Sequence, residues 1–218
     1  MSRFWMRQDL VVPHLVDYLT ERCGVREEDI TIVIANGTHT GGDEAELRTL
    51  VTDAVYDRIT VENHNCDSDD LVYLGTTPHG TPVSINRTAA LADMVICLGA
   101  ATHHVMAGFG GGRKSILPGI SSRETIFHNH AFSLDAAALR SNPAVGNGIL
   151  QGNPLHEDMC EAASLVKNLF MVNLVMNTQM RLAAIFSGHY LTSWEQACRT
   201  VNRIYQVDVP RKADVVIT

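Results

Sequence analysis

The sequence predicts an α/β fold: a Rossmann-like, mostly parallel sheet flanked by helices, with a local antiparallel hairpin. Two apolar runs, 30–35 (ITIVIA) and 94–98 (MVICL), are short and rich in β-branched residues, which is typical of strands buried on both faces. Segments with helical spacing of apolar residues separate such runs. This alternation indicates right-handed crossovers between parallel strands.

The elements of the first half follow this alternation up to residue 98. A short hairpin interrupts it between residues 71 and 86, where two β-like runs flank the turn-forming sequence Pro78-His79-Gly80. The other expected elements are a helix over 10–19 that ends before Gly24, the strand 30–35, a helix over 44–55, and the strands 59–62 and 94–98.

The second half is expected to begin with a helix from Asn153 to about residue 166. Asn153 is a favoured N-cap and Pro154 suits the first helical position. Glu157 and Asp158 suit the positive end of the helix dipole. Two strands, a helix and a final apolar run complete the expected pattern, over residues 169–175, 182–186, 191–205 and 213–217.

Composition excludes several classes of function. The net charge of −7, with no Lys/Arg-rich stripe, argues against nucleic acid as a partner. No apolar run approaches the roughly 20 residues that span a bilayer, and the N-terminus has no signal-peptide pattern, so a cytoplasmic location is expected. The five cysteines are scattered singly, which predicts neither a disulfide framework nor a zinc ribbon.

The segment 103–115 (HHVMAGFGGGRKS) carries the strongest chemical signal. The amides of Gly110, Gly111 and Gly112 can form an anion-binding nest, and Arg113 and Lys114 add positive charge, so a nucleotide phosphate is the expected guest. The segment is not a P-loop, because Arg113 occupies the position of the glycine before the lysine, and it does not match the dinucleotide fingerprint. A tight structural turn is the alternative.

Histidines gather near the predicted strand ends. His39 follows the strand 30–35, and the segment 103–115 follows the strand 94–98. Because ligands of open α/β sheets bind outside the carboxyl ends of strands, both are expected to line one crevice. His128 and His130 stand two residues apart at the start of a predicted helix, so they do not share a helix face and one metal ligand is expected rather than two.

Five blocks of the sequence together resemble the N-terminal domain of the nickel-pincer lactate racemase family, and the resemblance extends over essentially the whole chain. The blocks are Ile34-Ala35-Asn36-Gly37-Thr38-His39; Leu74-Gly75-Thr76-Thr77 with Gly80-Thr81-Pro82-Val83; the segment from His104 to Lys114 with Leu117-Pro118-Gly119-Ile120; Glu124-Thr125 with His130; and Gly152-Asn153-Pro154-Leu155.

The resemblance implies an isomerase that racemises or epimerises a 2-hydroxy acid. It implies that Lys114 is covalently linked to a nickel-pincer mononucleotide of the pyridinium-3,5-bisthiocarboxylate type, and that His130 ligates its nickel. His39 and His104 match the two histidines that alternate as acid and base during hydride transfer to and from the cofactor. Arg113, in the glycine-rich segment, is expected to contact the cofactor phosphate, with a surface or helix-capping role as the alternative. The small-molecule substrate and the enzymes that synthesise the pincer are the expected partners, and the oligomeric state stays open.

Three positions depart from the family pattern: Thr40 stands where arginine is common, Gly110 where serine is common, and His103 where many relatives have proline. The expected domain division is 1–209 as a catalytic and cofactor-binding domain that lacks its first segment, and 210–218 as the start of a truncated C-terminal domain. On this interpretation the substrate-carboxylate arginine lies ahead of Met1, and the isolated chain is expected to bind substrate poorly.

Two other hypotheses remain open from the sequence. One is a non-catalytic, nickel-free module of the same fold, in which the glycine-rich segment binds a nucleotide or phosphate. The other is a zinc-dependent hydrolase that uses His39, His104 and His130 as ligands with water in the fourth position. The sequence lacks HExxH or any other local zinc-ligand spacing, which argues against the hydrolase.

Overall fold

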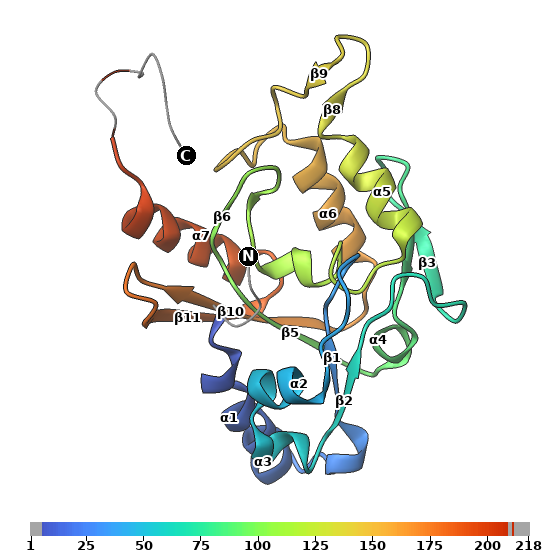
Figure 1. Ribbon diagram of the computed structural model, residues 1–218, viewed down its shortest axis with the longest axis vertical. Coiled ribbons are helices and arrows are strands. Elements are labelled where there is room, and N and C mark those ends of the chain that lie inside the picture. The colour runs from blue at the N-terminus through green and yellow to red at the C-terminus, as the bar shows by residue number, and fades with distance from the viewer. Residues whose placement is uncertain (1–5, 209–210, 212–218) are drawn as a thin grey trace.

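The computed structural model describes residues 6–208 and residue 211, and it confirms the predicted α/β class (Figure 1). Strand β5 (Val95–Ala100) crosses the centre of the molecule. The pair of strands β10 (Leu169–Met176) and β11 (Leu182–His189) lies on one side of it, and helices α5 (Arg123–Ala131) and α6 (Pro154–Ser164) lie above it. The apolar run 213–217 and the proposed domain start at residue 210 lie outside the described residues. None of the helices within the described part of the chain is both long and apolar enough to cross a bilayer.

The parallel strands are divided between two sheets. Strand β1 (Thr31–Ile34) pairs in parallel with β2 (Thr60–Asn63). In the second sheet β5 pairs in parallel with β10 (Leu169–Met176), and β11 (Leu182–His189) pairs antiparallel to β10 at the edge. The two sheets meet through side chains, since Leu98 of β5 packs in the same cluster as residues of β1.

The predicted hairpin is confirmed as β3 (Val72–Thr76) and β4 (Pro82–Ile85), which pair antiparallel. Two further antiparallel pairs were not predicted, because each strand has only two residues and carries no detectable period. They are β6 (His103–His104) with β7 (Gly108–Phe109), and β8 (Leu134–Asp135) with β9 (Arg140–Ser141). The β8–β9 pair projects from the body of the molecule (Figure 1).

The N-terminal helices are shorter than the periodicity predicted. The segment predicted over 44–55 is two helices, α2 (Glu44–Val51) and α3 (Asp53–Tyr56), because Thr52 between them has a positive φ of 78° that no helix accommodates. The segment predicted over 10–19 is a 3₁₀ turn at Gln8–Leu10, α1 (Val12–Asp17) and a π-helical turn at Tyr18–Arg22.

The remaining helices flank the central strands. They are α4 (Arg87–Leu91), α5 (Arg123–Ala131), α6 (Pro154–Ser164) and α7 (Thr192–Tyr205). The predicted N-cap of α6 is confirmed, since the Asn153 side chain accepts a hydrogen bond from the amide of His156. Ser122 caps α5 in the same way through the amide of Thr125. Both caps fix where the helices begin, and therefore where His130 stands on α5.

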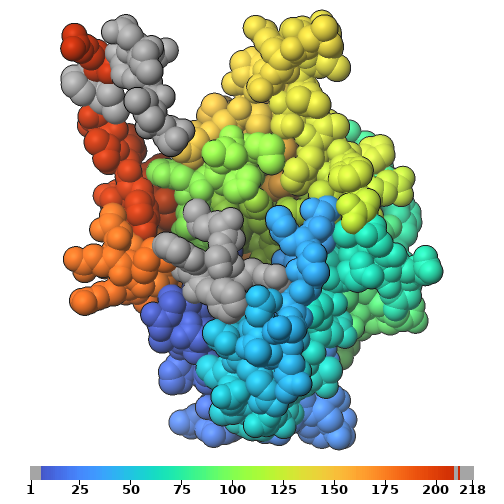
Figure 2. Space-filling view, viewed as in Figure 1, coloured from blue at the N-terminus to red at the C-terminus, as the bar shows by residue number. Residues whose placement is uncertain are grey.

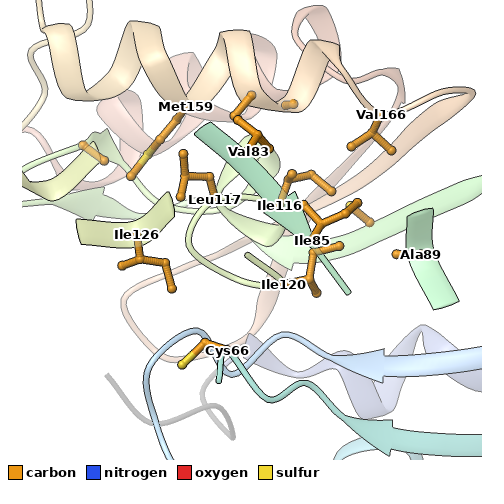
Figure 3. Packing of buried hydrophobic residues seen from close by; sticks show 14 of the residues in the cluster. Cys66, Val83, Ile85, Ala89, Ile116, Leu117, Ile120, Ile126, Met159 and Val166 are labelled. Carbon is orange, nitrogen blue, oxygen red and sulfur yellow. The ribbon is translucent and has the colours of Figure 1, made fainter. Parts of the chain in front are cut away.

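The largest apolar cluster lies between β4, α5, α6 and the segment that follows Lys114 (Figure 3). Ile116 and Leu117 of that segment are completely buried, as is Val83 of β4, and Met159 of α6 packs over them. Burying a side chain of this size contributes roughly 1.5–3 kcal/mol. The cluster therefore fixes the chain immediately after Lys114.

A buried carboxylate ties three of these elements together. Asp158 of α6 is completely buried and accepts hydrogen bonds from Thr77 Oγ1 at 2.6 Å, Thr81 Oγ1 at 3.0 Å and Asn129 Nδ2 at 2.7 Å. The sequence interpretation assigned Asp158 only to the helix dipole. Its contacts instead join the β3–β4 turn to α6 and to α5, one residue before His130.

We expect Asp158→Asn to lower the free energy of unfolding by about 2 kcal/mol, since its amide group would turn an N–H toward at least one of three buried donors. Urea unfolding measures this change. The matched control is Asp69→Asn, at an exposed aspartate, which should stay within about 0.5 kcal/mol of wild type. Equal stability of the two variants would show that the buried network contributes nothing.

Candidate functional site

The segment after β5 forms a compact loop that brings His104 to Lys114. The loop turns back on itself through the β6–β7 pair, and a 3₁₀ turn at Gly112–Ser115 follows. Lys114 Nζ lies 2.7 Å from His104 Nε2. The two residues that the sequence placed in different roles are therefore hydrogen-bonded partners.

Arg113 is buried beneath this loop rather than exposed beside Lys114. It is 1% exposed, and its guanidinium donates to the carbonyl oxygens of Ala107 at 2.6 Å and Phe109 at 2.9 Å, and to His156 Nδ1 at 3.1 Å. Its Cζ lies 3.9 Å from the centroid of the Trp194 ring. These contacts favour a role in holding the loop, and the predicted contact with a cofactor phosphate stays a prediction.

The glycines of the loop are required by close packing. A Cβ on Gly111 would lie 2.8 Å from the carbonyl oxygen of Ala100, and one on Gly112 would overlap the Trp194 ring. Both have positive φ, 69° and 55°. Gly110 donates its amide to Thr102 O, but no hydrogen bond among the described residues uses the amides of Gly111 or Gly112. Those two amides support the predicted anion-binding nest, while the packing explains why the positions are glycine.

Burial controls the electrostatics of the His104–Lys114 pair. It lowers the pKa of Lys114 to about 8, and the nearby Arg113 charge contributes to the shift. Burial likewise lowers the pKa of His104 to about 4, assisted by the charges of Lys114 and Arg113. The described residues place no carboxylate within ion-pairing distance of Lys114. His104 is therefore neutral near pH 7, and Lys114 loses its proton at a lower pH than an ordinary lysine.

His130 lies near the end of α5 with an unpartnered nitrogen. Its Nδ1 is buried and makes no hydrogen bond. Burial lowers the pKa of His130. The backbone of Ile126 offsets part of that shift, although it does not lie in position to accept a hydrogen bond from Nδ1. A buried imidazole nitrogen without a partner costs free energy and is an available ligand atom.

His39 is exposed on the loop after β1. Asn63 holds that loop, since its side chain donates to Gly42 O and accepts from Gly42 N and Asn36 Nδ2. Gly37 N donates to Gly119 O at 2.8 Å, which joins the loop to the segment after Lys114. Figure 2 shows this blue segment reaching the green and yellow-green segments. The two segments that were predicted to line one crevice are therefore neighbours, and the crevice itself stays a prediction. Among the described residues no hydrogen bond joins His39 to His104 or Lys114.

The three histidines of the zinc hypothesis do not form a metal-binding group. Within the described part of the chain the one cluster with such geometry is His79, Asp158 and Glu161. His79 Nδ1 is already 2.8 Å from Glu161 Oε2, and the oxygens of Asp158 accept from three donors. Both nitrogens of His104 are also engaged. The structure thus lends no support to zinc bound by His39, His104 and His130.

We expect the protein to lose stability as the pH falls below about 6.5. Burial lowers the pKa of four histidines, His64, His104, His130 and His156. Below the ordinary histidine pKa of about 6.5 these groups take up protons on unfolding but not in the folded state, so acid favours unfolding. The loss of stability with falling pH ends only below the pKa values of these histidines in the folded protein, about 4 for His104 and about 3 for His156.

Urea unfolding at pH 7.5 and pH 5 measures this dependence, whose limit is about 1.4 kcal/mol per pH unit for each such histidine. His156→Gln should reduce it, and His128→Gln, at an exposed position, should leave it unchanged. A free energy of unfolding that is equal or higher at pH 5 would contradict the expectation.

Comparison with known proteins gives a consistent set of relatives. The family model for the lactate racemase N-terminal domain matches residues 1–141, which include His39, His104, Lys114 and His130. The lactate racemase of Thermoanaerobacterium thermosaccharolyticum is 32% identical over 210 residues, covering 96% of this chain and 47% of that protein. The lactate racemase of Lactiplantibacillus plantarum is 32% identical over 179 residues, covering 82% and 41%.

Solved structures agree. The lactate racemase apoprotein of Thermoanaerobacterium thermosaccharolyticum superposes with a TM-score of 0.83 at 30% identity, over 92% of this chain and 46% of that one. A Thermotoga maritima protein superposes with a TM-score of 0.73 at 21% identity, over 90% and 51%, and shows likeness of fold alone. The chain spans about half the length of the curated relatives it matches.

Proposed function

Since the chain belongs to the lactate racemase N-terminal domain family, we propose that it racemises or epimerises a 2-hydroxy acid such as lactate with a nickel-pincer mononucleotide as cofactor. The observation that carries this proposal is the hydrogen bond of 2.7 Å between Lys114 Nζ and His104 Nε2. A proton-transferring imidazole then lies next to the amine that would hold the cofactor.

The residues present fit such a group. Lys114 offers an amine whose pKa of about 8 leaves a sizeable neutral fraction at physiological pH, as a nucleophile requires. His130 offers a buried nitrogen without a partner, and imidazole is a suitable ligand for nickel. The unused amides of Gly111 and Gly112 can donate hydrogen bonds to a phosphate oxygen.

The chain would divide the work among four side chains. Lys114 would hold the cofactor covalently and His130 would ligate its nickel. The pincer group, when bound, would supply the acceptor and donor of the C2 hydride. His39 and His104, on the two walls of the predicted crevice, would remove and return the hydroxyl proton; two such groups are needed because the hydroxyl of each enantiomer points to a different side.

Nickel content tests the proposal. The protein, coexpressed with the enzymes that synthesise the pincer, should contain close to one nickel per chain. It should interconvert the enantiomers of a 2-hydroxy acid at substrate concentrations high enough to offset the weak binding expected from the sequence. His130→Ala should lose most of the nickel, whereas His128→Ala, on an exposed face of the same helix, should retain it. Equal nickel content in the two variants would remove His130 from the proposal.

A further inference from the structure

Besides its proposed role in proton transfer with the substrate, His104 makes hydrogen bonds that bear on the protonation of Lys114. Its Nδ1 accepts hydrogen bonds from two backbone amides, Met106 N at 3.2 Å and Ala107 N at 3.1 Å. A nitrogen that accepts two hydrogen bonds carries no proton. Because a neutral imidazole has one proton, that proton must be on Nε2.

The consequence reaches Lys114, whose Nζ lies 2.7 Å from Nε2. A protonated Nε2 can only donate, so Nζ must be the acceptor. An ammonium group has three donors and no acceptor, whereas a neutral amine has one lone pair. The geometry points to a neutral Lys114 amine, held by a hydrogen bond from His104, in the protein without cofactor.

We propose that His104 is the positioning residue that keeps Lys114 a neutral, oriented nucleophile for attachment of the cofactor. The β6–β7 turn makes this possible, because it aims the amides of Met106 and Ala107 at Nδ1 and so excludes the other imidazole tautomer. The use of this amine to attach the cofactor rests on the proposed function. Its protonation state rests on the hydrogen bonds alone.

The charges around the pair agree with a neutral amine. The groups that act on Lys114 and His104 come from three elements and are all basic: Arg113 beside Lys114, His104 on β6 and His130 on α5. Among the described residues no hydrogen bond or ion pair joins Lys114 to His130 or to a carboxylate. No side chain in the described part of the chain therefore pairs with an ammonium ion at Lys114.

Attachment would then release His104. An amide-type nitrogen has no available lone pair and carries an N–H that donates. In the attachment, Nζ would bond to a thiocarboxyl carbon of the cofactor and lose a proton, while that carbon would release water or hydrogen sulfide. The acylated Nζ can no longer accept from His104 Nε2, so that Nε2 needs a new acceptor. The oxygen of a 2-hydroxy acid is such an acceptor, which would connect the loading of the cofactor to the availability of His104 for substrate.

Competitive labelling with acetic anhydride tests the proposal on the protein without nickel or cofactor. The amine attacks the carbonyl carbon, loses a proton and releases acetate, so only the neutral amine reacts. The chain has three lysines, Lys114, Lys167 and Lys212, and peptide mass spectrometry separates them. Lys167, which is exposed, corrects for reagent reactivity at each pH. The labelling midpoint of Lys114 is expected near pH 8.

Two matched variants decide the role of His104. His104→Gln replaces the obligatory donor by an amide whose oxygen can accept from an ammonium, so the midpoint of Lys114 should rise by at least about one pH unit. His103→Gln changes the neighbouring histidine, which bonds to Asn202 Oδ1 and not to Lys114, and should leave the midpoint unchanged. A wild-type midpoint near the ordinary lysine value of about 10.4, or one indifferent to His104→Gln, would overturn the proposal.

Nitrogen-15 NMR of the wild type gives an answer that needs no variant. At pH 9, above the midpoint expected for Lys114, His104 should show a protonated Nε2 and an unprotonated Nδ1, and the opposite tautomer would overturn the proposal. Both measurements use protein without cofactor. A neutral Lys114 that never acquires an adduct on coexpression would refute the proposed function alone, while an adduct formed on a lysine with an ordinary midpoint would refute only the role of His104.

Discussion

The Lys114→Ala variant is expected to carry no covalent adduct after coexpression with the pincer-synthesis enzymes. Lys114 is the lysine whose burial and hydrogen bond to His104 favour the neutral amine, and alanine offers no nucleophile. Intact mass should therefore equal that of the unmodified chain, and enantiomer interconversion should fall to background because the hydride chemistry belongs to the cofactor.

The matched control is Lys167→Ala, which removes an exposed lysine and should retain the adduct and the activity. Thermal unfolding of both variants checks that neither result reflects misfolding. If Lys114→Ala carried an adduct of the same mass as the wild-type protein does, the attachment would be at another residue. That result would contradict the role assigned to Lys114.

The second large effect is expected from Arg113→Met, which should lower the free energy of unfolding by about 3–5 kcal/mol. Methionine is similar in length but leaves the buried carbonyls of Ala107 and Phe109, and Nδ1 of His156, without their donor. Each such group costs about 1–3 kcal/mol. Loss of the stacking on Trp194 adds to this.

Removal of the buried charge of Arg113 opposes this loss of stability. Burial lowers the pKa of Arg113 to about 10, so the guanidinium stays charged without a carboxylate partner and its removal recovers some desolvation free energy. Guanidinium is weakly hydrated, and unpaired acceptors left in the interior outweigh that gain. Urea unfolding measures the balance, with Arg26→Met as control at a surface ion pair, where about 0–1 kcal/mol is expected. A loss below 1 kcal/mol for Arg113→Met would contradict the account.

The sequence predicted the elements that have local signals. The apolar runs at 30–35 and 94–98 are strands β1 and β5, and Pro78-His79-Gly80 marks the β3–β4 turn. Asn153 caps α6 as expected. These signals are periodicity, turn chemistry and capping, all of which act within a few residues.

The residues that hold the site together were not recognised from the sequence. The sequence predicts for Arg113 a contact with the cofactor phosphate, with a surface or helix-capping role as the alternative. It did not predict the buried contacts of Arg113 with His156 and Trp194, which lie far along the chain. Asp158 was read as a helix-terminal charge, although its partners lie on the β3–β4 turn and on α5. Such contacts depend on how the elements pack, which no local pattern specifies.

The roles of the site residues were predicted from the resemblance to a family, whereas the elements of the fold were predicted from local signals. His130 has a buried nitrogen without a hydrogen bond. The resemblance gave His104 and Lys114 separate roles, and their hydrogen bond was not predicted. It follows from the two-residue strands β6 and β7, which are too short to carry a sequence pattern. The roles of His39, His104, Lys114 and His130 stay predictions that the variants above test.

The most direct test of the central claim, racemisation by hydride transfer, follows the fate of the hydrogen on C2. One enantiomer of lactate deuterated at C2 is incubated in ordinary water with the coexpressed protein, and the opposite enantiomer is analysed by mass spectrometry. The account predicts that the product retains its deuterium, because the hydrogen leaves and returns with its electron pair and does not exchange with water. A product that carries hydrogen from water would show proton abstraction at C2 and would contradict the account.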